Sequence, residues 1–400
     1  MIVSNKKERF TLNILYLTIS YNLKSKGLYQ ALVDELVNNG HTVTIVRSMQ
    51  NDLGGAIEIV DDRLKCLNVK TADPFKSNLI KKGINQSLLN FYFKRAIKNN
   101  LLCEKYDLIL YATPPITLVN TIKYCKKYYS AKTFLMLKDI FPQNAVDLKL
   151  MKENGLIHKY FRMLEKKYYE CSDYIGCMSQ RNIDYVKSHN NEIDENKLHL
   201  FYNSIKIDEE EKQFFNNDIT RFMFGGNLGK PQNIELLLRI AKKLENYEKA
   251  KFIIMGEGTE VKRIKNFINE NKLNNLEFRE SLAQEEYEKI LKVSDVGLIV
   301  LDPRFTIPNI PSRFQTYLKL HKPVLAMTDR NTDLKEMIYL GACGWWCDSS
   351  NEDLILKCIK EICENKQEQI VRGENGYRYL CKEFDVKINV RQIEEFAAGI

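Results

Sequence analysis

The chain has 400 residues, of which 44% are apolar and 28% charged, the balance of a soluble globular protein of about two domains. No apolar run reaches the roughly 18 residues of a membrane-spanning helix, and the ten cysteines contain no C-x-x-C pair, so we expect reduced thiols rather than disulfides or zinc sites. The first 200 residues hold 30 Lys and Arg but only 20 Asp and Glu, whereas the remaining 200 hold 30 basic and 32 acidic residues. We therefore expect the first half either to bind an anionic partner or to present a solvated basic face.

Strands and helices alternate along the first half of the chain. Short apolar runs predict strands at 12–18, 41–46, 107–112, 132–137 and 174–178. Amphipathic periodicity predicts helices at 26–39, 114–129 and 156–171. This order is typical of a parallel, doubly wound sheet.

The second half repeats the scheme. We predict strands at 221–224, 251–255, 276–278, 296–301 and 324–326, and helices at 234–244, 261–271 and 285–293. The expected fold is α/β, with two Rossmann-like domains, 1–205 and 206–380, and a cleft between them. A last helix within 381–400 is expected to pack back on the first domain.

A segment near the C-terminal end, PSRFQTYLKLHKPVLA from Pro311 to Ala326, predicts an anion site. Ser312 and Gln315 form a candidate capping box at the start of a short helix. Arg313 lies in its first turn and Arg304 just upstream. Because a helix N-terminus already carries partial positive charge, cations there suggest a bound anion such as a phosphate.

Two more loops after predicted strands are rich in glycine: GGNLGK, ending at Lys230, and Gly256-Glu257-Gly258. Glycines permit close approach of the backbone to an anion, and parallel strands bring their carboxyl ends to one edge. Neither a G-x-G-x-x-G fingerprint nor a Walker sequence occurs, which disfavours dehydrogenases and nucleoside triphosphatases.

These segments resemble a known family. GGNLG, IIMGEG, SDVGLIVL and the Pro311 segment follow one another as in glycosyltransferase family four, over roughly residues 220–380. The DIFPQ segment at Asp139 is similar to the D-x-x-P-E/Q of its bacterial members that build O-antigen, capsule and exopolysaccharide. The resemblance implies a GT-B fold and a retaining glycosyltransferase that uses a nucleotide sugar.

The resemblance also implies residue roles. The donor diphosphate would be held partly through backbone amides of the first loop, by Gly226, Asn227, Lys230, Arg304, Ser312 and Arg313. The nucleoside would lie near Gly256, Gly258, Arg279 and Thr316. The catalytic set would be Asp139, Lys230 and Arg313, with Asp139 touching the acceptor or the donor sugar, or else only capping a helix.

The implied mechanism needs neither a protein nucleophile nor a cofactor. The acceptor hydroxyl attacks from the side that the phosphate leaves, the departing phosphate oxygen takes the proton, and the protein stabilises the diphosphate. No D-x-D signature is present, so we expect no metal. UDP is the expected nucleotide.

Residues 79–103 predict a basic amphipathic helix, with Ile80, Ile84, Leu88 and Phe91 among lysines and Arg95. It either packs on the core or lies on an anionic membrane, where a polyprenyl-diphosphate-linked saccharide acceptor would be. We therefore expect a cytoplasmic protein, peripheral at the inner face of the membrane. Nucleic-acid binding is disfavoured because Tyr128, Tyr129, Tyr168 and Tyr169 also fit helix faces.

The sequence departs from the family at three points. Asn227 and Gln232 stand where many members have Arg and Lys, Thr316 stands where many have Glu, and no histidine matches the one that often contacts the donor sugar. Two alternatives therefore stay open: an inactive transferase-like partner subunit, and a nucleotide-sugar epimerase of the same fold.

Overall fold

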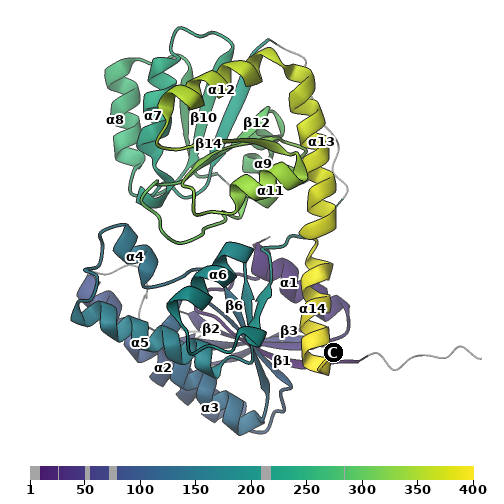
Figure 1. Cartoon of the computed structure of the whole chain (residues 1–400). Helices are drawn as coiled ribbons and strands as arrows, with labels where there is room; N and C mark the ends of the chain where they lie inside the picture. The colour runs from purple at the N-terminus through teal and green to yellow at the C-terminus, as the bar shows by residue number, and fades with distance from the viewer. Residues whose placement is uncertain (1–9, 26, 50–54, 72–78, 209–217, 283) are drawn as a thin grey trace, which may run out of the picture. The chain divides into compact units, whose positions relative to one another are not determined.

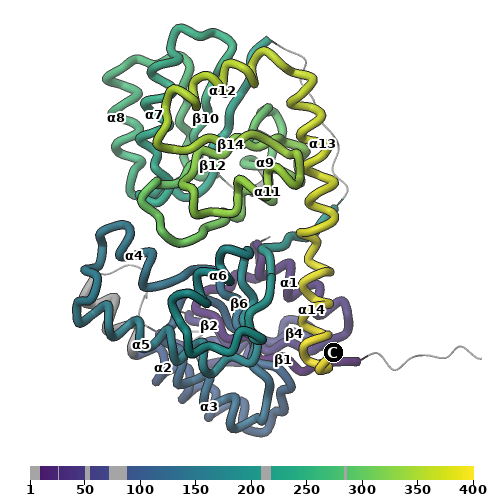
Figure 2. Tube along the Cα trace, in the orientation of Figure 1, coloured from purple at the N-terminus to yellow at the C-terminus, as the bar shows by residue number. Residues whose placement is uncertain are grey.

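The computed structural model describes residues 10–25, 27–49, 55–71, 79–208, 218–282 and 284–400. The chain divides into two compact units, each described here by itself. Unit one comprises Met1–Val146, Met151–Lys206 and Val386–Ile400, and unit two comprises Asp147–Leu150 and Ile207–Asp385. Figure 1 labels many of their elements, and the alternation of strand and helix can be followed along the trace in Figure 2.

Unit one is built on an eight-stranded sheet of order β3-β4-β2-β1-β5-β6-β7-β8. All neighbouring strands are parallel except β3 and β4, which form an antiparallel hairpin at one edge. The strands are β1 (Asn13–Leu17), β2 (Thr42–Met49), β3 (Ile57–Asp61), β4 (Leu64–Lys70), β5 (Leu108–Ala112), β6 (Lys132–Leu137), β7 (Tyr174–Cys177) and β8 (Leu198–Leu200).

Helices cover both faces of this sheet (Figure 1). One layer holds α2 (Leu79–Asn100), α3 (Val119–Tyr129), α5 (Leu156–Cys171) and α6 (Gln180–His189), and α4 (Gln143–Asp147) precedes α5. The other layer holds α1 (Leu28–Asn38) and α14 (Val386–Ala398). The last helix is fixed there by Glu394, whose Oε1 lies 2.9 Å from Nε2 of buried His41, and by Phe396, whose ring packs on Phe134.

Unit two has a six-stranded, fully parallel sheet of order β11-β10-β9-β12-β13-β14. Its strands are β9 (Thr220–Gly225), β10 (Ala250–Gly256), β11 (Leu276–Glu280), β12 (Val296–Val300), β13 (Val324–Thr328) and β14 (Gly344–Asp348). Its helices are α7 (Ile234–Lys243), α8 (Val261–Asn271), α9 (Gln284–Lys292), α10 (Arg313–Lys319), α11 (Leu334–Gly341), α12 (Glu352–Glu364) and α13 (Lys366–Glu383).

The predicted fold class, two doubly wound parallel sheets, is confirmed. No helix within the described ranges is long and apolar enough to cross a bilayer. The helix expected at 114–129 begins later, as a 3-10 turn at Ile116–Leu118 followed by α3.

Tyr317 of α10 attaches this short helix to the sheet of unit two. Its ring is fully buried, and its hydroxyl lies 3.1 Å from the Met223 carbonyl and accepts from the Gly225 N–H at 3.3 Å. A Cβ on Gly297 of β12 would lie 2.3 Å from the Tyr317 ring, so the glycine makes room for it. The position of α10 therefore depends on Tyr317.

We predict that Tyr317→Phe lowers the free energy of unfolding by about 1–3 kcal/mol, because it leaves buried backbone groups without their partner. Urea unfolding of the whole chain measures this. Tyr339→Phe is the matched control, since Tyr339 is 71% exposed and should tolerate the same change. If the Tyr317→Phe variant were as stable as the parent, the hydroxyl of Tyr317 would not hold α10 on the sheet as we infer.

Candidate functional site

Three loops meet at the carboxyl edge of the sheet in unit two. The Gly226 N–H donates to the Met255 carbonyl at 3.0 Å, and the Leu228 N–H donates to the Glu257 carbonyl at 2.8 Å, which joins the loop after β9 to the loop after β10. The Asp302 N–H donates to the Pro231 carbonyl at 2.9 Å, which adds the loop after β12. The three loops that the sequence singled out thus form one connected surface.

Glycine is required where the first two loops touch. Gly256 and Gly258 have φ angles of 150° and 149°, which side chains rarely adopt. A Cβ on Gly256 would lie 1.8 Å from the Gly226 carbonyl oxygen, and one on Gly258 would lie 2.4 Å from that of Leu228. Contact between the loops therefore explains these two glycines before any nucleoside is considered.

Arg313 lies beneath this turn with an incomplete set of partners. Its guanidinium carbon is 4.2 Å from the centre of the Phe224 ring, and its Nη2 would be 3.4 Å from a Cβ on Gly226. Its Nη1 is buried and has no hydrogen-bond partner among the described residues. Burial lowers the pKa of Arg313, while the nearby Tyr317 and Tyr287 oppose this. A buried guanidinium nitrogen without an acceptor is costly, so the geometry suits an anion at Gly226.

The structure corrects the amide assignment at Gly226. Its N–H already donates to Met255, so Gly226 can offer an anion close approach but no hydrogen bond. The N–H of the next residue, Asn227, has no partner within the described ranges, and Asn227 is exposed. Lys230 is also exposed, in the 3-10 turn Lys230–Gln232 at the end of the same loop. Asn227 and Lys230 remain available to a ligand.

The capping box predicted at Ser312 and Gln315 is wrong. Ser312 has helical dihedral angles (φ −59°, ψ −19°), and its side chain caps no backbone N–H. The extended conformation that lets an N-cap side chain turn back to the helix is therefore missing. Ser312 is exposed beside Arg313.

Arg304 already has an acidic partner. Its Nε and Nη2 donate to the carboxylate of Asp302 at 2.8 and 2.6 Å, and these hydrogen bonds raise the pKa of Arg304. The Arg304 side chain is 46% exposed. Arg304 therefore brings less uncompensated positive charge to the loop than Arg313 does.

The two remaining nucleoside candidates lie on different elements of unit two. Arg279 of β11 is opposite Met255 in the strand register and pairs with Glu277 at 2.5 Å. Thr316 is half-buried on α10, next to Tyr317. The contacts of these two residues within the described structure do not indicate which ligand either of them would bind.

Asp139 belongs to unit one, just after β6. Its N–H and that of Lys138 both donate to Oγ1 of buried Thr113, at 3.1 and 3.0 Å, which fixes the turn after β6 against the end of β5. Burial raises the pKa of Asp139 to about 6 and lowers that of Lys138 to about 7. The Asp139 carboxylate has no hydrogen-bond partner among the residues that the structure describes, so it can accept hydrogen bonds from a ligand.

Sequence reasoning missed the side chains that position these groups. Phe224 stacks on Arg313, Tyr317 holds α10, and Tyr287 of α9 packs so closely on Gly225 that a Cβ there would lie 2.4 Å from its hydroxyl. Aromatic residues on predicted strands and helices are usually core residues, so the sequence offered no separate signal for this role.

The comparisons with known proteins agree with this architecture. Residues 206–379 match the family model described as Glycosyl transferases group 1. A relative from Pseudomonas aeruginosa, named "Probable glycosyltransferase WbjE", is 24% identical over 300 residues, which cover 72% of this chain and 74% of the relative.

Solved structures of low sequence identity share the fold. Sucrose-phosphate synthase from Thermosynechococcus elongatus has a TM-score of 0.76 at 12% identity, over 97% of this chain and 98% of its own. Anabaena HepE in complex with UDP and glucose has a TM-score of 0.69 at 14% identity, over 97% and 100%. The chain therefore has the GT-B fold, and its residues 206–379 match the group 1 glycosyltransferases in sequence.

Proposed function

We propose that the chain is a retaining glycosyltransferase, which moves a sugar from a nucleotide diphosphate sugar to a hydroxyl of a saccharide acceptor. The observation that carries the proposal is Arg313: its Nη2 lies beside the glycine turn of Gly226, and its buried Nη1 has no acceptor among the described residues. A diphosphate oxygen at this turn would complete its hydrogen bonds. The family match of residues 206–379 supports the same assignment.

UDP is the nucleotide that we propose. Two solved structures that share the fold were obtained with it or its sugar: HepE with UDP and glucose, and an Escherichia coli trehalose-6-phosphate protein with UDP-2-fluoro glucose. Arg279 and Thr316 are the proposed contacts on the nucleoside side, together with Gly256 and Gly258. The sugar itself stays open.

The proposed mechanism relies on stabilising the leaving group. Arg313, Lys230 and the Asn227 N–H would neutralise the charge that develops on the diphosphate as the glycosidic bond breaks, with Ser312 and Arg304 at the edge of the site. The acceptor oxygen forms its bond on the face that the phosphate leaves, and its proton passes to the departing phosphate oxygen. The protein cations, rather than a metal, perform the neutralisation in this proposal.

Asp139 is the proposed contact for the hydroxyl groups of a sugar in unit one. Its carboxylate is ionised at neutral pH, because its raised pKa of about 6 is still below 7. A half-buried, ionised carboxylate without a hydrogen-bond partner among the described residues accepts strongly from hydroxyl donors. Because Thr113 fixes the turn, the carboxylate would be held in place before the sugar arrives.

The acceptor that we propose is a saccharide linked to polyprenyl diphosphate, in the synthesis of a bacterial surface polysaccharide such as O-antigen or capsule. The bacterial relative WbjE and the structural similarity to WaaG, described as involved in lipopolysaccharide biosynthesis, support this direction. Such an acceptor would place the protein at the cytoplasmic face of the membrane.

We predict that Arg313→Gln weakens UDP binding by about 10- to 100-fold, because it removes charge-assisted hydrogen bonds to the diphosphate. Isothermal titration calorimetry with UDP, in magnesium and in EDTA, measures this. Arg263→Gln, a change at an exposed arginine of α8, is the control and should leave the affinity unchanged. If the folded parent bound no nucleotide at all, the inactive-subunit alternative would replace the proposal.

We predict that Asp139→Asn slows transfer, or hydrolysis of the donor in the absence of acceptor, by about 100-fold. The rate of the parent should fall as the pH drops through about 6, where Asp139 becomes protonated, and this decline should disappear in the variant. UDP affinity serves as the control and should not change. A variant that kept the parental pH profile would rule out this role for Asp139.

A further inference from the structure

The two helix layers of unit one differ sharply in charge. On one face of the sheet, α2 carries five basic residues and no acidic residue, and α3 carries three basic residues and no acidic residue. On the same face, α5 carries four basic and two acidic residues. On the other face, α1 carries two acidic residues and no basic one, and α14 carries two of each. The basic excess of the first half of the chain therefore lies mainly on the helices of one layer.

The first half of α5 also exposes large apolar side chains. Leu156 is 88% exposed, Ile157 65%, Tyr160 43% and Met163 43%. Leu156, Tyr160 and Met163 follow the spacing of one helix face, and the buried side of α5 carries other residues, such as Leu164 and Tyr168. We call Leu156, Ile157, Tyr160 and Met163 the α5 apolar stripe.

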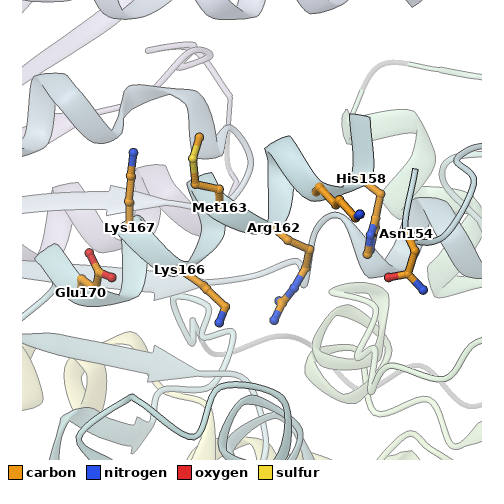
Figure 3. A pocket seen from close by; sticks show the side chains of 8 residues that line it. Asn154, His158, Arg162, Met163, Lys166, Lys167 and Glu170 are labelled. Carbon is orange, nitrogen blue, oxygen red and sulfur yellow. Dashed lines mark hydrogen bonds between the residues drawn. The ribbon is translucent and has the colours of Figure 1, made fainter. Parts of the chain in front are cut away.

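Basic residues border this stripe. Lys159 and Lys167 form no ion pair within the described part of the chain, whereas Lys166 pairs with Glu192 at 2.7 Å. Figure 3 shows Lys167 and Met163 on one side of α5, with Arg162 and Lys166 on the other. These four side chains, with Asn154, His158, Lys159 and Glu170, line a hollow of about 430 Å³. Apolar and basic groups are thus interleaved along α5.

A buried polar atom at the hollow has no hydrogen-bond partner among the described residues. His158 lines it and is 7% exposed; its Nδ1 accepts from the Asn154 N–H at 3.2 Å. Its Nε2 is buried without a hydrogen-bond partner among the described residues. Together with Lys159 and Lys167, which form no ion pair in the described part of the chain, this side chain forms a setting that suits a phosphate group.

We propose that the α5 apolar stripe and its basic border bind the surface of a bilayer that contains anionic phospholipids. The stripe would enter the boundary between headgroups and acyl chains, and the lysines would contact lipid phosphates at the level of the hollow. This inference rests on the proposed function, because an enzyme that uses a lipid-linked acceptor has to work at a membrane surface.

Other occupants fit these observations less well. A second copy of the chain, packed stripe against stripe, would bring Lys159 and Lys167 close to the same lysines of its mate, which is unfavourable. Single-stranded nucleic acid stacks successive bases on accessible rings, but Tyr168 and Tyr169 of α5 are fully buried, which leaves Tyr160 as the exposed ring of this helix. An anionic lipid surface satisfies both the exposed apolar side chains and the positive charge.

For the helix expected at 79–103, two alternatives stayed open: packing on the core, or lying on an anionic membrane. The side chains of residues 79–87 lie outside the described part of the structure. Beyond them, α2 packs Leu89, Phe93 and Ile97 into the core, while Leu88 and Phe91 are 41% and 58% exposed. The core interpretation therefore holds for one face of α2, and α5 offers the larger apolar surface.

Flotation of the whole chain with lipid vesicles tests the inference. We expect binding to phosphatidylcholine vesicles that contain phosphatidylglycerol, little binding to pure phosphatidylcholine, and loss of binding in about 1 M salt, where the Debye length falls to about 3 Å. Lys159→Gln combined with Lys167→Gln should weaken partitioning about 30-fold, at roughly fivefold for each lysine. Leu156→Ser combined with Ile157→Ser should weaken it at least about tenfold.

Matched controls make the outcome specific. Tyr339→Ser combined with Leu340→Ser removes two apolar side chains of α11 that are 71% and 79% exposed, and it should not alter vesicle binding. UDP affinity of every variant, measured by calorimetry, separates this test from that of the donor site. The inference would be overturned if the α5 variants bound vesicles as well as the parent, or if the parent did not bind anionic vesicles. It would also be overturned if the parent bound glycerol phosphate but no vesicles. A change of oligomeric state in the α5 variants without a change in vesicle binding would overturn it as well.

Discussion

The close approach of two loops in unit two is the constraint on which the candidate site depends. The Gly226 carbonyl lies where any side chain on Gly256 would have to be, so β9 and β10 can end side by side only with glycine at that position. Their contact leaves the turn at Gly226 exposed above Arg313. Phe224 supports the guanidinium from the other side, and Tyr317 fixes the helix that carries it. A rigid cation beneath an open glycine turn is thus built into the fold before any ligand binds, which is the preorganisation that leaving-group stabilisation requires.

The two units divide the chemical work that we propose. Unit two provides positive charge at the edge of a parallel sheet, as suits a diphosphate. Unit one places the Asp139 carboxylate at the corresponding edge of its own sheet and gathers its basic residues on the layer of α2, α3 and α5. The opposite layer is closed by α14, which His41 and Phe134 hold in place. A sugar contact and a lipid-facing surface can therefore belong to one unit without competing for the same residues.

The bounds of helices and strands could be predicted from the sequence where the apolar periodicity is clear. The predictions for β6, α5 and α8 match the observed bounds, since each begins and ends at a clear change in pattern. The helix α13 gave no such signal, because it buries Gly373 against the His321 carbonyl and Gly376 against Leu318 instead of presenting a stripe of large residues. The hairpin of β3 and β4 was missed as well; β3 is an edge strand that leaves Ile59 78% exposed.

The roles of residues at the site were harder to predict from the sequence than the fold. The glycine-rich loops and Arg313 were found because their residue types are unusual at strand and helix ends. The hydrogen bond that occupies the Gly226 N–H, the pairing of Arg304 with Asp302 and the missing cap at Ser312 all depend on tertiary contacts or local dihedral angles that residue type does not specify. That Nη1 of Arg313 has no partner among the described residues likewise follows only from the complete set of its neighbours.

The most direct test of the central claim is a crystal structure of the chain with UDP bound. The account predicts a diphosphate oxygen within hydrogen-bond distance of Nη1 of Arg313, next to Gly226 and the Asn227 N–H. A nucleotide bound elsewhere, or a bound nucleotide that leaves Nη1 of Arg313 without a partner, would contradict it.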